Sequence, residues 1–281
     1  MKIGELLNIG IVKLKENAID SYILDSQILL AHVLEKNKLY IIINKDIEVD
    51  KEKEDVFLKF IKERAENKPI KYITKQAEFM GFEFFVDKGV LIPRPETEAL
   101  VEMSLDYINR FNYKKVLDLC AGSGAIGLSI AKLANVEVAL SDISDKAIEV
   151  SRINKKKLNI DNANIVKSDL LNEFIKNKDK YDIIVSNPPY IEKAEIDNLM
   201  EDVKCYEPYE ALCGGEDGLL FYKKIIKDST LILNKGGLIL FEIGYNQGDE
   251  VKNLLLENKF SSIDIVKDLA GLDRIVVGVF R

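Results

Sequence analysis

The chain has 281 residues, of which 47% are hydrophobic and 31% charged, and its formal net charge is −7. This composition is typical of a globular protein with one large or two modest domains, and no run approaches the ~20 apolar residues of a membrane span. Cys120, Cys205 and Cys213 lack metal-binding spacing, and their odd number argues against a disulfide framework. We therefore expect a cytoplasmic protein without a metal or a membrane partner.

The charge is divided unevenly along the chain. Residues 1–75 hold 14 basic and 13 acidic side chains, a net charge of +1, whereas residues 76–281 hold 26 basic and 34 acidic side chains, a net charge of −8. Proteins that bind nucleic acid backbones usually carry a basic excess. Because the acidic part also carries the motifs described below, we expect no direct binding of nucleic acid.

Residues 1–75 are predicted to form a small all-helical domain. Apolar residues recur at helical spacing from Ile3 to Leu14, a second helix follows a cap at Asp20 or Ser21, and a third runs from about 53 to 66. The side chains expected to face inward from the third helix are Val56, Phe57, Phe60 and Ile61. No catalytic constellation occurs here, so the pattern fits a partner-recognition module and a stabilising subdomain equally well.

Residues 76–92 change in character and are predicted to form a hairpin that links two domains. They are rich in strand formers, including Val90 to Ile92, and Gly81 and Gly89 punctuate them. The segment from Ile92 to Glu98 follows, with two prolines. It is either the start of a helix over residues 98–108 or a rigid wall beside an active site, and spacing alone favours the helix start.

Residues 93–281 are predicted to form an α/β domain with a doubly wound, mainly parallel, Rossmann-like sheet, because strands and helices alternate along the chain. The expected strands cover residues 116–119, 136–140, 164–166, 183–185, 237–241, 263–266 and 275–279. The expected helices between them cover residues 126–133, 146–158 and 219–227.

A glycine-rich loop joins the first of these strands to its helix. Its residues 122–127 fit G-x-G-x-x-G, a pattern that lets a ligand approach the backbone closely but does not separate a nicotinamide cofactor from S-adenosylmethionine. Asp118 at the strand end would repel a pyrophosphate and attract the ammonium group of a methionine moiety. A dehydrogenase has no need for the Asn-Pro-Pro-Tyr of residues 187–190. Both features favour S-adenosylmethionine.

Acidic residues also follow the next two strands. Asp142 is placed to accept hydrogen bonds from both ribose hydroxyls. Asp169 can accept from an adenine amino group, and Leu170 can pack on the ring. Each aspartate alone is more commonly a loop or cap residue, but three at successive strand ends together predict an adenosine-type cofactor.

The segment Asn187 to Tyr190 follows the fourth strand and carries the predicted chemistry. The Asn187 side-chain oxygen and the Pro188 carbonyl can accept from the two N–H bonds of an amide or an exocyclic amine, which turns the nitrogen lone pair toward a methyl group. Pro188 and Pro189 stiffen the bend, and Tyr190 can pack over a planar substrate group. The only histidine, His32, lies in a predicted helix and is expected to be a packed or rim residue, so we do not expect nucleophilic hydrolysis.

These motifs together resemble the bacterial peptide chain release factor glutamine methyltransferases, nearly from end to end. The Asn-Pro-Pro-Tyr motif is shared with adenine-N6 DNA methyltransferases, whereas the segment before the cofactor loop is far more specific. The segments that carry the resemblance are Ile92 to Glu98, Asp118 to Gly127, Asn187 to Tyr190, Tyr206 to Leu219, Glu242 to Gly248 and Asp268 to Arg274.

The resemblance implies a class I methyltransferase fold, with a seven-stranded sheet whose last strand is antiparallel. It implies that the protein methylates the glutamine side-chain amide in the Gly-Gly-Gln motif of release factors and that the helical domain helps to hold the release factor. The cofactor contacts implied by position are Cys120, Ala121, Gly122, Ser123, Gly124, Asp142, Leu170 and Asn187, and the glutamine contacts are Asn187, Pro188, Pro189 and Tyr190. Cys120 stands where the family has a glycine, from which we expect a tuned cofactor pocket.

Three other functions remain open at this point. A sister enzyme that methylates a glutamine of a large-subunit ribosomal protein shares the core motifs. An adenine amino-methyltransferase is disfavoured by the acidic charge of the catalytic part. A cofactor-binding protein without activity is disfavoured by the intact Asn187 to Tyr190 segment and Asp142. We expect a monomer in each case.

Overall fold

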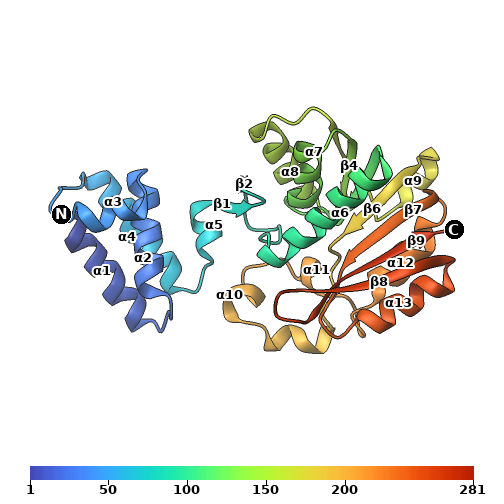
Figure 1. Cartoon of the computed structure of the whole chain (residues 1–281). Coiled ribbons are helices and arrows are strands. Elements are labelled where there is room, and N and C mark those ends of the chain that lie inside the picture. The colour runs from blue at the N-terminus through green and yellow to red at the C-terminus, as the bar shows by residue number, and fades with distance from the viewer. The chain divides into compact units, whose positions relative to one another are not determined.

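The computed structural model describes all 281 residues, and their contacts divide the chain into two compact units. The first unit comprises residues 1–76 and 200–206, and the second comprises residues 77–199 and 207–281 (Figure 1). The return of residues 200–206 to the first unit was not expected from the sequence. None of the helices is long and apolar enough to cross a membrane.

The first unit is built from helices around its own apolar core. They are α1 (Ile3–Glu16), α2 (Tyr22–Leu34), α3 (Lys38–Ile43), α4 (Lys51–Ala65), α5 (Ile70–Thr74) and α10 (Glu201–Lys204). Asp50 caps α4 by accepting from the Lys53 N–H at 2.9 Å. Phe57 and Ile61 face inward as predicted. The prediction for Val56 is wrong, because this side chain lies on the outer face of α4 and is 38% exposed.

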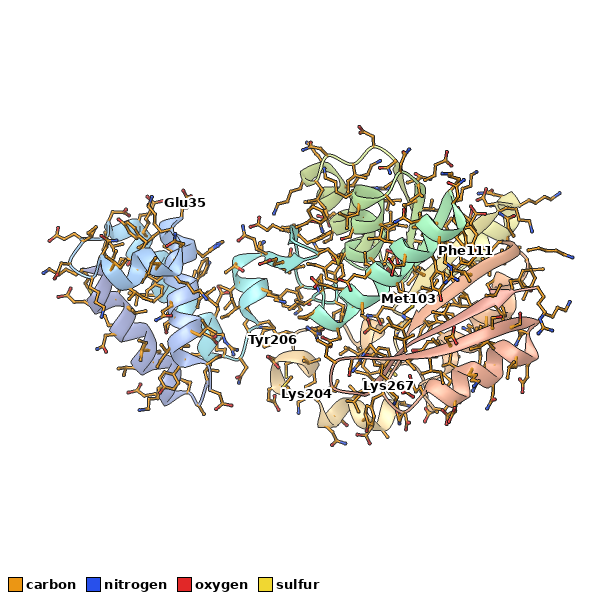
Figure 2. The ribbon with its side chains drawn as sticks, in the orientation of Figure 1. Glu35, Met103, Phe111, Lys204, Tyr206 and Lys267 are labelled. Atoms are coloured by element: carbon orange, nitrogen blue, oxygen red, sulfur yellow. The ribbon has the colours of Figure 1, made fainter.

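Two polar contacts hold this unit together beside its core. The Arg64 guanidinium on α4 forms a largely buried ion pair with Asp25 of α2, with 2.7 Å between Nε and Oδ2. The Tyr206 hydroxyl donates to the Glu66 carbonyl at 2.6 Å, which ties the returning segment to the end of α4; Figure 2 labels Lys204 and Tyr206 of this segment. The His32 ring lies 6.1 Å from the Phe60 ring in the helical packing, as expected.

The predicted hairpin is present but shorter than expected. Strands β1 (Gln76–Phe79) and β2 (Phe82–Phe85) are joined by a turn whose two central residues, Met80 and Gly81, have positive φ. Residues 90–92 do not form the predicted strand. Val90 and Ile92 are instead buried in an irregular segment, where packing supplies the burial that their apolar character demands.

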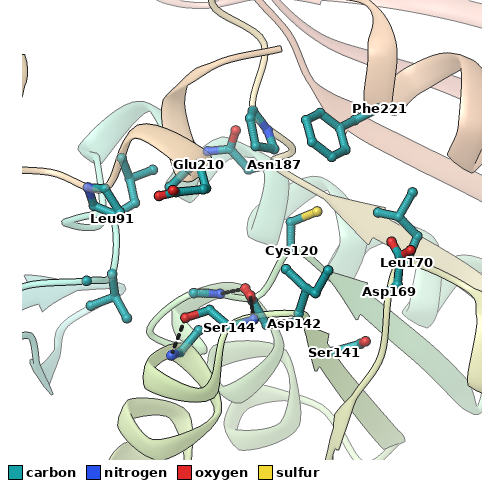
Figure 3. A pocket seen from close by; sticks show the side chains of 18 of the residues that line it. Leu91, Cys120, Ser141, Asp142, Ser144, Asp169, Leu170, Asn187, Glu210 and Phe221 are labelled. Carbon is teal, nitrogen blue, oxygen red and sulfur yellow. Dashed lines mark hydrogen bonds between the residues drawn. The ribbon is translucent and has the colours of Figure 1, made fainter. Parts of the chain in front are cut away.

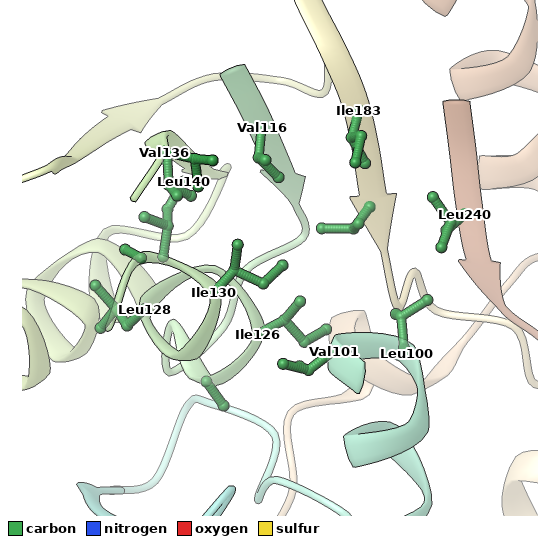
Figure 4. Close-up of a cluster of buried hydrophobic side chains, with 14 of the residues drawn as sticks. Leu100, Val101, Val116, Ile126, Leu128, Ile130, Val136, Leu140, Ile183 and Leu240 are labelled. Carbon is green, nitrogen blue, oxygen red and sulfur yellow. The ribbon is translucent and has the colours of Figure 1, made fainter. Parts of the chain in front are cut away.

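The second unit is a seven-stranded sheet with helices on both faces. Its strands are β3 (Lys115–Leu119), β4 (Glu137–Asp142), β5 (Ala163–Lys167), β6 (Tyr181–Ser186), β7 (Leu233–Glu242), β8 (Phe260–Lys267) and β9 (Asp273–Phe280). Their order is β5-β4-β3-β6-β7-β9-β8, and β9 runs antiparallel to both β7 and β8, whereas all other pairs are parallel. Figure 4 shows part of the core on one face, where Ile126, Leu128 and Ile130 pack beneath Val116 and Ile183. The predicted class I methyltransferase architecture is confirmed.

The remaining helices connect these strands. They are η1 (Pro95–Thr97), α6 (Glu98–Phe111), α7 (Ala125–Leu133), α8 (Asp145–Lys157), α9 (Asn172–Asn177), η2 (Lys193–Asn198), α11 (Tyr209–Leu212), α12 (Leu220–Ser229) and α13 (Gly248–Glu257). The parallel register pairs Leu119 with Ser141 and with Ser186, and Ser186 with Phe241. The loops after β3, β4, β6 and β7 therefore leave the sheet at one edge, where ligands of such sheets bind.

Candidate active site

A cavity of about 450 Å³ opens at this carboxyl edge of the second unit (Figure 3). Its wall comes from the loops after β3, β4, β5 and β6 and from residues near α11 and α12. The lining residues are Gly89, Val90, Leu91, Cys120, Gly122, Ser141, Asp142, Ile143, Ser144, Ala147, Ser168, Asp169, Leu170, Asn187, Pro189, Pro208, Glu210, Ala211 and Phe221. The cavity thus gathers several residues that the sequence predicted at separate strand ends.

The glycine-rich loop packs tightly against the sheet. A Cβ on Gly127 would lie 2.7 Å from Leu140 Cγ and 2.8 Å from Asp118 Oδ2, so only glycine lets α7 approach the strands this closely. Gly122 has φ +55° and open space beside it, and it lies on the cavity wall. The loop therefore offers bare backbone to a ligand in the cavity.

Asp118 lies behind the loop and not on the cavity wall. Its Oδ2 accepts from the Gly127 N–H at 2.8 Å, whereas its Oδ1 is buried without a hydrogen-bond partner. Complete burial raises the pKa of this carboxyl to about 8. The geometry gives Asp118 a clear role in holding the first turn of α7, and its attraction for a methionine ammonium group stays a prediction.

Ala121, Ser123 and Gly124 also lie in the loop but do not line the cavity. The Ala121 N–H donates to the Ser141 carbonyl at 3.0 Å, and the Gly124 N–H donates to the Ala121 carbonyl at 2.7 Å. The Asn154 amide donates to the Ser123 carbonyl and to the Phe85 carbonyl, each at 2.9 Å. These residues shape the loop, and their contact with a cofactor stays a prediction.

Asp142 ends β4 and faces the cavity, and each of its carboxylate oxygens already accepts from a backbone N–H group. Oδ2 accepts from the Gly122 N–H and Oδ1 from the Ser144 N–H, each at 2.9 Å (Figure 3). Burial raises the pKa of the carboxyl, and these backbone donors oppose that shift. An ionised carboxylate can accept about four hydrogen bonds, so each oxygen keeps capacity for a ribose hydroxyl.

Asp169 and Leu170 lie together on the wall after β5, where an adenine ring was predicted. Leu170 has φ +48°, a left-handed conformation that is costly for a non-glycine residue. Phe221 of α12 and Ile143 add apolar surface to this cavity. No sequence pattern indicated Phe221 as a cavity residue, because an apolar residue in an amphipathic helix is normally assigned to the core.

Cys120 occupies the cavity wall with φ +57°, a conformation that favours glycine. Burial raises the pKa of its thiol well above the usual range, and the nearby Asp142 raises it further. The thiol is therefore neutral and is a poor nucleophile or metal ligand. Its effect on the shape of the cofactor pocket stays a prediction.

Asn187 lies on the wall just past β6 and presents an unused acceptor. Its Nδ2 donates to Thr97 Oγ1 at 3.4 Å, whereas its Oδ1 accepts nothing from the rest of the chain. The Pro188 carbonyl likewise accepts no hydrogen bond within the protein. The Ser186 hydroxyl donates to the Leu119 carbonyl at 2.8 Å and fixes the strand end beneath them. Two oxygens are thus held at a fixed bend and remain available to donors.

The residues after Asn187 differ in their relation to the cavity. Pro189 lines it, but Pro188 and Tyr190 do not. Tyr190 packs against the core on one face of the sheet, and burial raises the pKa of its phenol to about 12. The phenol is therefore neutral at physiological pH, and its packing over a substrate group stays a prediction.

A network of hydrogen bonds holds the chain that follows Tyr190. Gln247 Nε2 donates to the Tyr190 carbonyl at 3.0 Å, and the Ile191 N–H donates to the Leu212 carbonyl at 3.0 Å. Gly214 is required there, since a Cβ would lie 2.8 Å from the Pro189 carbonyl oxygen. Gln247 and Gly214 belong to the segments that carried the resemblance, but their contacts join residues too far apart in the chain to be predicted from spacing.

The segment from Ile92 to Glu98 lies against the same edge. The Arg94 guanidinium contacts both carboxylate oxygens of the buried Glu207, at 2.7 and 2.8 Å. Thr97 is buried beside Asn187, and the Glu98 carboxylate accepts from the Met80 N–H at 2.6 Å. The segment leads into α6, as the helix-start interpretation predicted, and Thr97 lies beside Asn187. None of residues 92–98 lines the cavity, so the role of a rigid wall stays a prediction.

Comparison with known proteins shows the family of the chain. Residues 97–203 match the family described as methyltransferase small domain, and residues 5–74 match the PrmC N-terminal domain. The chain is similar to a release factor glutamine methyltransferase of Clostridium acetobutylicum, with 51% identity over 99% of each chain. It is also similar to one of Clostridium botulinum, with 48% identity over 98% of each chain. In fold it resembles a T. Thermophilus 16S rRNA methyltransferase in complex with AdoMet and guanosine, with a TM-score of 0.52, 19% identity, and coverage of 73% of this chain and 50% of that one.

Proposed function

The chain belongs to the release factor glutamine methyltransferase family, and we propose that it transfers the methyl group of S-adenosylmethionine to the side-chain amide nitrogen of the glutamine in a release factor's Gly-Gly-Gln motif. The observation that carries this proposal is a pair of unused acceptors, Asn187 Oδ1 on the cavity wall and the carbonyl of the next residue, Pro188. A primary amide has two N–H donors on one nitrogen, which is the pattern that two such acceptors recognise.

The cavity residues fit the cofactor. Asp142 would accept from the ribose hydroxyls, Asp169 from the adenine amino group, and Leu170 with Phe221 would pack on the ring. Gly122 lets the cofactor approach the backbone. When bound, S-adenosylmethionine supplies a methyl group on a positively charged sulfur, which is electrophilic enough for direct displacement.

The chain's own contribution is to orient a poor nucleophile. The amide nitrogen shares its lone pair with the carbonyl, so it attacks only when its N–H bonds are held and the lone pair points at the methyl carbon. Asn187 and Pro188 would hold these two bonds. As the N–C bond forms and the S–C bond breaks, the nitrogen gains positive charge and then releases one proton. Neither acceptor is a strong base, so this proton leaves late, to water.

The first unit is proposed to hold the release factor. Its short helix α3 exposes Leu39 and Ile43 at 63% and 68%, which leaves apolar surface available to a protein partner. A protein substrate also agrees with the net charge of −8 on residues 76–281. We propose that the enzyme acts as a cytoplasmic monomer, in keeping with its three free cysteines.

The test is a competition between the candidate substrates. Purified release factors and large-subunit ribosomal proteins are incubated with the enzyme and S-adenosylmethionine in one reaction, and the peptides are analysed by mass spectrometry. The proposal expects one added methyl group on the glutamine of the Gly-Gly-Gln peptide. Methylation confined to a ribosomal protein would favour the sister activity, and the absence of methyl from the release factors would reject the proposal.

A further inference from the structure

A buried carboxyl lies directly behind Asn187. Glu242 ends β7, whose Phe241 is paired with Ser186 of β6, so Glu242 and Asn187 are the next residues on two neighbouring strands. Glu242 is 1% exposed and does not line the cavity. A carboxyl buried this completely is rare unless its oxygens are used.

The contacts of Glu242 lead to the substrate side of the site. The Thr97 hydroxyl and the Asn187 side-chain amide are the donor groups that face its carboxyl, and both lower its pKa. Asn187 Nδ2 also lies 3.4 Å from Thr97 Oγ1. The second carboxyl oxygen, Oε2, is buried without a partner. The three side chains form a compact network that joins η1, the segment after β6 and the end of β7.

This network determines which end of the Asn187 amide faces the cavity. A carboxylate only accepts hydrogen bonds, so the part of Asn187 that faces it must be the NH₂ group. The Thr97 hydroxyl has one hydrogen, which it gives to the carboxylate, and its oxygen can then accept only from that same NH₂ group. Asn187 Oδ1 must therefore face away from Glu242, toward the cavity.

We propose that Glu242, acting together with Thr97, is a positioning residue that holds the Asn187 amide with its oxygen toward the substrate. The inference rests on the proposed function, because the orientation matters only if that oxygen accepts from a substrate N–H. A reversed Asn187 amide would place its NH₂ group against the N–H of the substrate, so two donors would face each other. A misplaced contact at the reacting group lowers the rate on the order of a hundredfold.

The orientation depends on the protonation of Glu242. Burial and, to a smaller extent, Glu96 of η1 raise the pKa of the carboxyl, whereas Thr97 and Arg274 of β9 lower it, and the resulting pKa is about 7. The nearby phenols of Tyr190 and Tyr222 have raised pKa values, so they stay neutral across this range. When Glu242 is protonated, its O–H can donate to Asn187 Oδ1 and the reversed amide becomes allowed. The correct orientation is enforced as the pH rises through about 7.

The experiment compares Glu242→Gln and Thr97→Val with the wild-type enzyme. Release factor methylation should show kcat lowered by about a hundredfold in Glu242→Gln, with little change in the KM for S-adenosylmethionine. The rise of wild-type kcat through about pH 7 should be absent from this variant, because glutamine does not titrate. Thr97→Val should lower kcat but keep the pH dependence, since the carboxyl remains.

Tyr222→Phe is the matched control. The Tyr222 hydroxyl donates to the backbone carbonyl of Glu242 at 2.8 Å, so this variant disturbs the same residue without touching its carboxyl. It should keep kcat within a few-fold of the wild type and the same pH dependence. If Glu242→Gln behaved like this control, the positioning role would be rejected.

A second readout needs no substrate. The side-chain NH₂ resonances of Asn187 in the free wild-type enzyme should titrate near pH 7 and should not titrate in Glu242→Gln. The inference is overturned, and the proposed function is kept, if the wild type is active but neither its Asn187 resonances nor its rate differ from those of Glu242→Gln. A wild type that leaves release factors unmethylated overturns the proposed function, while the resonances still report on the network.

Discussion

The two halves of the carboxyl edge differ in how far their polar groups are already satisfied. In the cofactor half, after β3, β4 and β5, both oxygens of Asp142 accept from backbone N–H groups, and the Ser123 carbonyl is bonded as well. The groups without a partner there, Asp118 Oδ1 and Ser141 Oγ, are buried. In the transfer half, after β6 and β7, Asn187 Oδ1, the Pro188 carbonyl and Glu242 Oε2 have no partner.

This difference reflects two tasks. The cofactor half binds the same ligand in every turnover, so it is preorganised by its own hydrogen bonds and adds only spare acceptor capacity. The transfer half must gain its interactions when the substrate amide arrives, so its acceptors are left open at a cost in stability. Unused acceptors at a rigid bend are therefore a stronger sign of the reacting centre than the cavity itself.

Replacing Asn187 should cause the largest loss of methyl transfer. Asn187→Ala removes one of the two oxygens that orient the amide, and we expect kcat to fall by about a thousandfold. The dissociation constant for S-adenosylmethionine should change much less, because the proposed adenosine contacts, Asp142, Asp169 and Leu170, lie after other strands. Single-turnover kinetics and calorimetry measure the two quantities, with the exposed Asn177→Ala as a control. Near-normal turnover would refute the orienting role.

The cost of the buried carboxyl should appear in the pH dependence of stability. Burial raises the pKa of Glu242 from 4.5 to about 7, so the stability that its protonated form contributes is complete below pH 4.5 and is lost as the pH rises through about 7. The free energy of unfolding should therefore fall by up to about 3 kcal/mol over this pH range in the wild type, and this fall should be absent from Glu242→Gln. Denaturant titrations across the range measure it. A residual slope is expected, because Asp118 titrates near pH 8.

An unchanged slope in Glu242→Gln would mean that this carboxyl is not protonated in the native state. The Asp118→Asn variant is the partner experiment, since it should remove the later part of the slope and leave the part near pH 7. Together the two variants separate the effect of Asp118, which holds the glycine-rich loop, from the effect of Glu242, which belongs to the transfer half.

Replacing Asp142 should affect the cofactor half and spare the transfer half. Asp142→Ala removes the acceptor proposed for the ribose hydroxyls, so the dissociation constant for S-adenosylmethionine should rise tenfold to a hundredfold, or about 1.4 to 3 kcal/mol. At saturating cofactor, kcat should stay within about tenfold of the wild type. Isothermal calorimetry and saturation kinetics check this. Loss of kcat without loss of affinity would contradict the division between the halves.

The smallest effect is expected at Cys120. Cys120→Gly relieves a left-handed conformation with φ +57° but adds chain entropy to the unfolded state, so the free energy of unfolding should change by less than about 1 kcal/mol. Affinity for S-adenosylmethionine should change by only a few-fold. A large loss of affinity would show that the side chain itself contacts the cofactor. Thermal unfolding and calorimetry are sufficient.

Most of the fold could be predicted from the sequence because its signals are local. Buried strands alternating with amphipathic helices predicted the second unit, and strand-end acids predicted the cavity residues Asp142 and Asp169. The short helices α3 and α5 were missed because six or five residues carry little periodicity. Residues 90–92 were assigned to a strand because composition does not distinguish a strand from a buried irregular segment.

The inner parts of the site could not be predicted because they depend on contacts between distant segments. Asp118 lies at the predicted strand end, but the residues on either side of it in β3 are both buried. No alternation of apolar and polar residues therefore indicated to which face of the sheet its side chain points. Glu242 follows an apolar strand and is 145 positions from Thr97 in the chain, and only the sheet register brings them to Asn187. Networks of this kind become visible only in three dimensions.

The most direct test of the orienting pair is a crystal structure of the enzyme with the demethylated cofactor and a Gly-Gly-Gln peptide. We predict that the glutamine Nε2 lies within about 2.7 to 3.2 Å of both Asn187 Oδ1 and the Pro188 carbonyl oxygen, with the Asn187 NH₂ group toward Thr97 and Glu242. A bound glutamine whose amide oxygen faces Asn187, or whose nitrogen contacts neither acceptor, would contradict the account.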